Sequence, residues 1–82
     1  MSLSDKEKRE RIKFNIAIGN QIRKKRLAKN VSAGELARRM FTDKPNLVRI
    51  EKGRVNTSIF VLHKIAEALG ISLEQLFRGL KC

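Results

Sequence analysis

The chain has 82 residues, 19 of them Lys or Arg and eight Asp or Glu, so its formal net charge at pH 7 is +11. This length fits one small domain, and a hydrophobic fraction of 41% is enough for a core, which excludes a wholly disordered basic tail. A membrane span and a signal peptide are excluded, because no apolar run approaches the roughly 18 residues that a span needs. With one Cys and one His, the chain can form neither an internal disulfide nor a zinc site of N and S ligands, so we expect no metal and no cofactor.

The positive charge is concentrated in the middle of the chain. Residues 20–54 contain eleven basic side chains and three acidic ones, so this stretch carries a net charge of +8. A concentrated positive field attracts polyanions, and nucleic acid is the commonest polyanion inside cells. A surface that is basic only for solubility is the simpler alternative. A membrane partner is not expected, because no segment combines a basic face with an aromatic and apolar one.

The apolar residues follow a helical spacing nearly throughout, beginning with a first helix. Phe14, Ile18 and Ile22 recur every four residues, and the next inward position is Arg26. Asn30 follows, a residue that tolerates the left-handed conformation in which helices end. The pattern predicts a helix whose last inward position is charged.

Before this helix, residues 1–13 form a segment of mixed charge. Opposite charges lie four residues apart, as in Asp5 and Arg9, which favours a helical extension over a frayed arm. We therefore divide the chain into this charged N-terminal extension and a single domain at residues 14–80.

Two short helices follow, each with its own start signal. Ser32 and Glu35 have the spacing of a capping box, in which the hydroxyl accepts an amide hydrogen bond and the carboxylate reaches back, and they open a helix at 33–40. Asp43 caps a third helix at 44–52.

The last two helices are also marked by capping residues. A fourth helix begins at Thr57 or Ser58 and ends at Gly70, and Ser72 and Gln75 form a second capping box that opens a short fifth helix. Nothing reads as an alternating strand with a hairpin turn. The predicted fold class is all-α, a compact bundle of five helices.

Two charged residues, Arg26 and Glu51, lie on the inward stripes of the first and third helices. Because an unpaired buried charge costs several kcal/mol, we expect these two to form an ion pair that ties the helices together. The alternative is that both side chains extend outward to solvent.

The second and third helices, with a connection of about three residues, have the spacing of a helix-turn-helix at about residues 33–52. In that arrangement the first helix lies across the DNA backbone and the second enters the major groove with its N-terminal end toward the bases. Leu47 and Ile50 face the core, so other side chains of this helix face outward. The candidates for reading bases are Lys44, Pro45, Asn46 and Arg49.

Another group of residues is placed to bind phosphates and set the register on DNA. Ser32 and the amides that begin at Ala33 form the N-terminus of the second helix. Arg23, with Lys24 and Lys25, is expected on a solvated face of the first helix, and the alternative is that one of the three reaches a phosphate. The candidates that follow the third helix are Lys52, Arg54 and Asn56.

A series of short motifs runs through roughly residues 16–77. They are Ile18-Gly19-x-x-Ile22-Arg23-x-x-Arg26, Val31-Ser32-x-x-Glu35-Leu36-Ala37, Leu47-x-Arg49-Ile50-Glu51-Lys52-Gly53, Leu62-x-Lys64-Ile65-Ala66-x-Ala68-Leu69-Gly70-Ile71-Ser72 and Leu76-Phe77. In this order and spacing they resemble the Cro and phage-repressor type of helix-turn-helix domain, also called the XRE-like family. The resemblance implies a phage-repressor-like five-helix fold, usually dimeric on a two-fold symmetric operator, with an Arg–Glu pair at Arg26 and Glu51.

Several positions depart from the family pattern. Ala33 stands where the family often has Gln, and Phe41 and Thr42 stand where it usually has Gly and a Val-like core residue. The third helix often begins with a polar pair, and here it begins with Lys44 and Pro45. Base reading is therefore expected to depend more on the side chains of Lys44, Asn46 and Arg49. The departures at Ala33, Phe41 and Pro45 favour an alternative, a protein-interaction module that has lost DNA reading. The strong positive charge of residues 20–54 argues against that alternative.

Several apolar side chains of the last two helices look too hydrophobic for the exterior of a monomer. Either they complete the core or they form a dimer contact, and both explanations fit the sequence. These residues are Phe60, Val61, Phe77 and Leu80.

An enzyme is not expected, because the chain has no Gly-rich phosphate loop, metal cluster or nucleophile–base arrangement. The predicted function is a sequence-specific, double-stranded DNA-binding transcriptional regulator, acting as a homodimer in a bacterial or phage cytoplasm. Two alternatives keep the fold: an antitoxin, or the controller of a restriction–modification operon. A protein partner is therefore possible, and the sequence does not identify it or the neighbouring genes.

Overall fold

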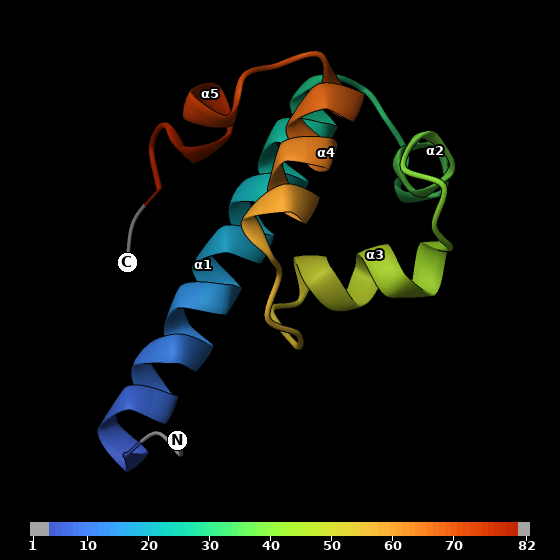
Figure 1. Cartoon of the computed structure of the whole chain (residues 1–82). Helices are drawn as coiled ribbons and strands as arrows, with labels where there is room; N and C mark the ends of the chain where they lie inside the picture. The colour runs from blue at the N-terminus through green and yellow to red at the C-terminus, as the bar shows by residue number, and fades with distance from the viewer. Residues whose placement is uncertain (1–3, 81–82) are drawn as a thin grey trace.

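The computed structural model describes residues 4–80, and these residues form five α-helices without strands (Figure 1). The predicted all-α fold class is confirmed. The predicted extension is helical from residue 5 and continuous with the first helix, while residues 1–3 lie outside the described part. The helices are α1 (Asp5–Ala28), α2 (Ala33–Arg39), α3 (Lys44–Glu51), α4 (Ile59–Leu69) and α5 (Leu73–Phe77).

Each helix begins at a side chain that accepts a hydrogen bond from the amide three residues on, which stabilises the first turn. The capping box predicted at Ser72 and Gln75 is complete. The one predicted at Ser32 is only half formed, because the Glu35 carboxylate pairs with Arg38 and Arg39 of its own helix instead of reaching back. The five capping residues are Ser4, Ser32, Asp43, Ser58 and Ser72.

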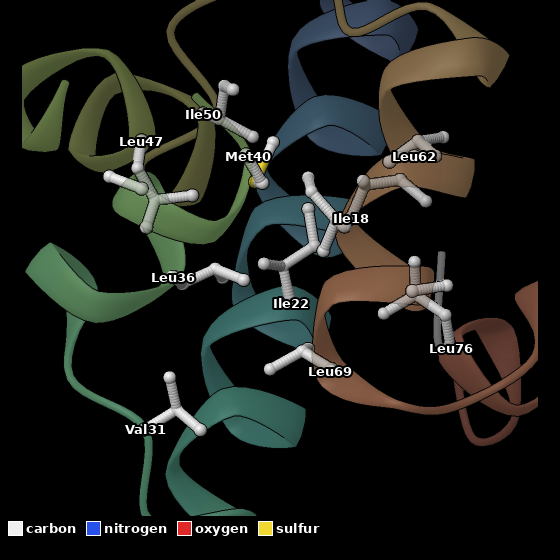
Figure 2. Close-up of a cluster of buried hydrophobic side chains, with 13 residues drawn as sticks. Ile18, Ile22, Val31, Leu36, Met40, Leu47, Ile50, Leu62, Leu69 and Leu76 are labelled. Carbon is white, nitrogen blue, oxygen red and sulfur yellow. The ribbon is translucent and has the colours of Figure 1, made fainter. Parts of the chain in front are cut away.

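A single hydrophobic core joins all five helices (Figure 2). Every helix contributes one large side chain that is less than 2% exposed, so no helix packs independently of the rest. Such burial contributes about 1.5–3 kcal/mol per side chain. The five side chains, in chain order, are Ile22, Leu36, Leu47, Ile65 and Leu76.

The N-terminal part of α1 extends beyond the other four helices (Figure 1). Phe14, predicted as the first inward position of this helix, is 48% exposed, so that prediction is wrong. The core stripe begins one turn later, at Ile18. The reason is tertiary, because the rest of the chain first reaches α1 at Asn15 and Ile16.

Two glycines allow α3 and the turn after it to lie directly on α1. A Cβ at Gly19 would overlap the carbonyl oxygens of Ile50 and Glu51. Gly53, at φ +71°, brings the turn onto the backbone of Ile16, where a Cβ would be 2.6 Å from the amide nitrogen. The position of α3 in the bundle therefore depends on backbone contact with α1.

For four apolar residues of the last two helices, the sequence allowed either a place in the core or a dimer contact. The structure separates them into two groups. Val61, Phe77 and Leu80 are half-buried and pack against the core. Phe60 is 64% exposed, and its neighbour Ile59 is 65% exposed. Of the four predicted residues, Phe60 at the start of α4 is thus the one that remains exposed.

Within the described residues, no helix is both long and apolar enough to cross a membrane. The same part of the chain contains no group of three or more His, Cys, Asp or Glu side chains arranged to hold a metal ion.

Candidate nucleic-acid interface

The predicted ion pair between Arg26 and Glu51 is present and fixes the orientation of α3. Arg26 donates from Nε to Glu51 Oε2 at 2.7 Å and from Nη2 to Oε1 at 3.0 Å. Its Nη1 donates to the carbonyl oxygen of Val31 at 2.9 Å, just before α2. Both charged residues are buried, and the hydrogen bonding that Arg26 donates to Glu51 raises the pKa of Arg26 above its usual value. One guanidinium therefore joins α1, α3 and the start of the helix-turn-helix.

The turn between α2 and α3 contains an unusual backbone conformation. Phe41 has φ +58°, in the left-handed region that bulky side chains rarely adopt, and it is 93% exposed. Its ring has no place in the core. The Lys64 ammonium lies 5.9 Å from the centroid of this ring and equally far from that of Phe60. The turn is closed behind it by a hydrogen bond from the Thr42 amide to the Ala37 carbonyl at 2.9 Å.

The outward face of α3 presents three of the four predicted base-reading residues. Lys44, Pro45 and Arg49 are exposed, whereas Asn46 is half-buried. The Asn46 amide donates to Thr42 Oγ1 at 3.0 Å, and its Oδ1 accepts from Arg49 Nη2 at 3.4 Å. Both ends of this amide are therefore engaged within the protein, with one end on Arg49.

Beside α3 lies a cavity of about 590 Å³, here called the basic recess. Its lining brings together residues from α1, the start of α2, α3 and the turn that follows. The only carboxylate, Glu51, is already paired with Arg26, so the remaining cationic groups dominate the field there. The lining residues are Asn20, Arg23, Arg26, Ala33, Val48, Glu51, Lys52 and Arg54.

The basic recess unites three of the five predicted phosphate-binding residues, Ala33, Lys52 and Arg54. It also adds Arg23, which the sequence placed on a solvated helix face. The signal for Arg23 was its spacing, one turn before Arg26 on the same helix.

The other two predicted phosphate-binding residues lie outside the recess lining. Ser32 is exposed, and its Oγ accepts from the Glu35 amide at 3.1 Å, which leaves the hydroxyl proton for another partner. Asn56 is exposed on the loop between α3 and α4, and its Oδ1 accepts from Asn15 Nδ2 at 2.7 Å. That hydrogen bond ties the loop to α1.

Two helices in the helix-turn-helix relation, with a basic outward face and an adjoining basic recess, define a protein of the helix-turn-helix DNA-binding class. The sequence matches the helix-turn-helix family HTH_3 over residues 22–76, and the chain belongs to this family. The XRE-like resemblance is thereby confirmed.

Solved structures of transcriptional regulators have the same fold. The clp gene regulator ClgR from C. glutamicum is 29% identical, with a TM-score of 0.76 over 79% of this chain and 84% of the other. The restriction–modification controller protein C.AhdI from Aeromonas hydrophila is 30% identical, with a TM-score of 0.76 over 80% of this chain and 96% of the other. An HTH_3 family transcriptional regulator from Vibrio cholerae is 29% identical, with a TM-score of 0.77 over 83% of this chain but 38% of its own.

Among curated proteins, no sequence match was found. The family and these structures identify the chain as a DNA-binding transcriptional regulator and not an enzyme.

Proposed function

We propose that the protein binds a two-fold symmetric operator in double-stranded DNA as a homodimer, with α3 of each protomer in the major groove. The observation that carries this proposal is the exposed pair Lys44 and Arg49 on α3, with the basic recess beside it. A helix with cationic groups toward the bases and further cations toward the backbone suits both parts of DNA recognition.

Base reading is assigned to Lys44 and Arg49, which can donate to the O6 and N7 atoms of guanine. Arg49 can do so with both arms of its guanidinium, and its hydrogen bond from Nη2 to Asn46 limits the orientations that it must lose on binding. Asn46 then acts as a positioning residue for Arg49 in place of a direct reader of adenine. Pro45 offers only an apolar contact, such as one with a thymine methyl group.

Phosphate binding is assigned to the basic recess, through Arg23, Lys52 and Arg54, with the amide of Ala33. Ser32 and Asn56 would add hydrogen bonds from its two sides. Such contacts supply affinity that is independent of base sequence and falls steeply as salt rises.

The homodimer proposal is supported by the exposed apolar side chains of Ile59 and Phe60 at the start of α4. Exposed apolar side chains that lie together commonly mark an interface. Regulators act where the DNA is, and the similar structures named above come from bacteria, so we propose a bacterial cytoplasm as the location.

Selection of bound duplexes from a random-sequence pool at about 150 mM salt, followed by sequencing, tests this function. We expect enrichment of a two-fold symmetric motif whose half-sites lie about one helical turn apart. Absence of any enriched motif, with binding that vanishes as salt rises, would overturn sequence-specific recognition.

A role as a restriction–modification controller is the second candidate. It is favoured by the 30% identity to C.AhdI, because the match covers 96% of that controller. Restriction and methyltransferase genes next to the gene of this protein, with the selected motif upstream of them, would support it.

A further inference from the structure

The first two to three turns of α1 have no part in the helix-turn-helix and lie before residues 22–76, which match the family. All side chains at positions 5–14 are exposed, and this part of α1 extends past the bundle (Figure 1). Its charged residues are not evenly placed around the helix. The basic ones are Lys6, Lys8, Arg9, Arg11 and Lys13, and the acidic ones are Asp5, Glu7 and Glu10.

The side of α1 that faces the loop after α3 is defined by one hydrogen bond, from Asn15 Nδ2 to Asn56 Oδ1 at 2.7 Å. Residues four and seven positions before Asn15 lie on the same side of an α-helix. These are Arg11 and Lys8, one and two turns beyond the loop, and both are exposed. Of the three acidic residues, Glu7 and Asp5 flank this side, four positions before Arg11 and three before Lys8, whereas Glu10 falls on another side.

This side of α1 continues a surface that already carries positive charge. The loop reached by Asn15 begins directly after Lys52 and contains Arg54, and both residues line the basic recess. Arg11 and Lys8 stand about 6 and 10 Å along the helix axis from Asn15, at a rise of about 1.5 Å per residue. The loop after α3 and the N-terminal turns of α1 thus place their basic side chains one after another along one side of the molecule.

We propose that Lys8 and Arg11 bind phosphates of the DNA beyond those reached by the helix-turn-helix, which makes the N-terminal turns of α1 a second DNA contact. This inference rests on the proposed DNA-binding function. A polyanion fits this side better than a second copy of the chain does, because a second copy carries the same excess of positive charge. The contact would lengthen the bound segment without reading its bases.

The test compares two double variants of the full chain that lose the same charge. Lys8→Ala with Arg11→Ala removes the side that faces the loop, and Lys6→Ala with Lys13→Ala removes cations from the opposite side of the same helix. All four side chains are exposed, so both variants should keep the wild-type melting temperature and helix content. The measurement is the slope of log K against log salt concentration on the selected duplex, extended by ten or so base pairs of flanking DNA.

The binding constant falls as salt rises, and each phosphate contact adds about 0.9 to the steepness of this slope. We therefore expect the slope of the first variant to fall by about 2 units relative to wild type, and that of the second variant to stay unchanged. Equal slopes for both variants would overturn this inference while leaving the helix-turn-helix proposal standing. Failure of the wild-type protein to bind the duplex at all would instead overturn the proposed function.

Discussion

Gly19 of α1 lies against the carbonyl group of Glu51, the same residue whose carboxylate holds Arg26. Backbone and side chain of Glu51 are thus both fixed to α1, which sets the position of α3. Gly19 and Arg26, two residues of one family motif, share a structural explanation, because both serve the same contact between α1 and α3.

Replacement of Gly19 tests this close approach. In Gly19→Ala, the new methyl group would overlap the carbonyl oxygens of Ile50 and Glu51, so the helices must separate. We expect a loss of about 3 kcal/mol in the free energy of unfolding, measured by urea denaturation. Gly34→Ala is the matched control, since a Cβ in α2 meets nothing within 4 Å and should raise stability by about 0.5 kcal/mol. Equal stability of the two variants would contradict the contact.

The Arg26–Glu51 pair is tested by a double-mutant cycle. Each single alanine variant leaves a buried charge without its partner and should cost about 3–5 kcal/mol. The double variant should cost clearly less than the sum of the two, as expected for residues in direct contact. Urea unfolding in the Gly34→Ala background measures all four proteins, and strictly additive losses would be incompatible with a coupled pair.

The backbone strain at Phe41 can be measured by substitution. Because the side chain is exposed, replacing it changes the packing of the protein little. At φ +58°, any residue with a Cβ is disfavoured, whereas Gly is not. We expect Phe41→Gly to be about 1 kcal/mol more stable than Phe41→Ala, from thermal or urea unfolding. The comparison with Ala removes the effect of losing the ring and its contact with Lys64. A Gly variant that is no more stable than the Ala variant would show that the turn carries no strain.

Arg49 and Lys52 should differ in the kind of DNA binding that they support. Arg49→Ala should cost about 1–3 kcal/mol on the selected operator and relax the choice at one base pair. Lys52→Ala, in the basic recess, should weaken operator and random DNA alike and lower the salt slope by about 1. Fluorescence anisotropy with both duplexes separates these effects. An equal loss on both duplexes for Arg49→Ala would remove its reading role.

Phe60 and Phe77 provide a matched pair for the proposed dimer. Phe60→Ser changes an exposed side chain, so it should weaken self-association in sedimentation experiments without lowering the melting temperature. Phe77→Ser should lower the melting temperature, because Phe77 packs against the core. If the Phe60 variant associates like wild type, the start of α4 is not the dimer contact.

Much of the fold was predictable from local signals. Capping residues such as Asp43 and Ser72 mark helix starts because their side chains bond to amides only three positions away. The Arg26–Glu51 pair was predictable as well, since two charges on inward stripes have few other ways to be satisfied. These features depend on short-range spacing and on the cost of burial, which the sequence contains by itself.

The exposure of several side chains, by contrast, depended on how the helices pack against one another. Phe14 continues the helical stripe yet is 48% exposed, and the buried stripe begins one turn later, at Ile18. Phe77 is half-buried and Phe60 is not, although both are aromatic residues near helix ends. Arg23 joins the basic recess, which only the packing of α1, α2 and α3 forms. The hydrogen bonds of the Asn46 side-chain amide with Thr42 and Arg49, by contrast, are local contacts within the third helix and the turn before it. The sequence by itself thus determined the helices and the class of protein, whereas the tertiary structure decided which side chains remain exposed for DNA or a partner, because exposure depends on neighbours far apart in the chain.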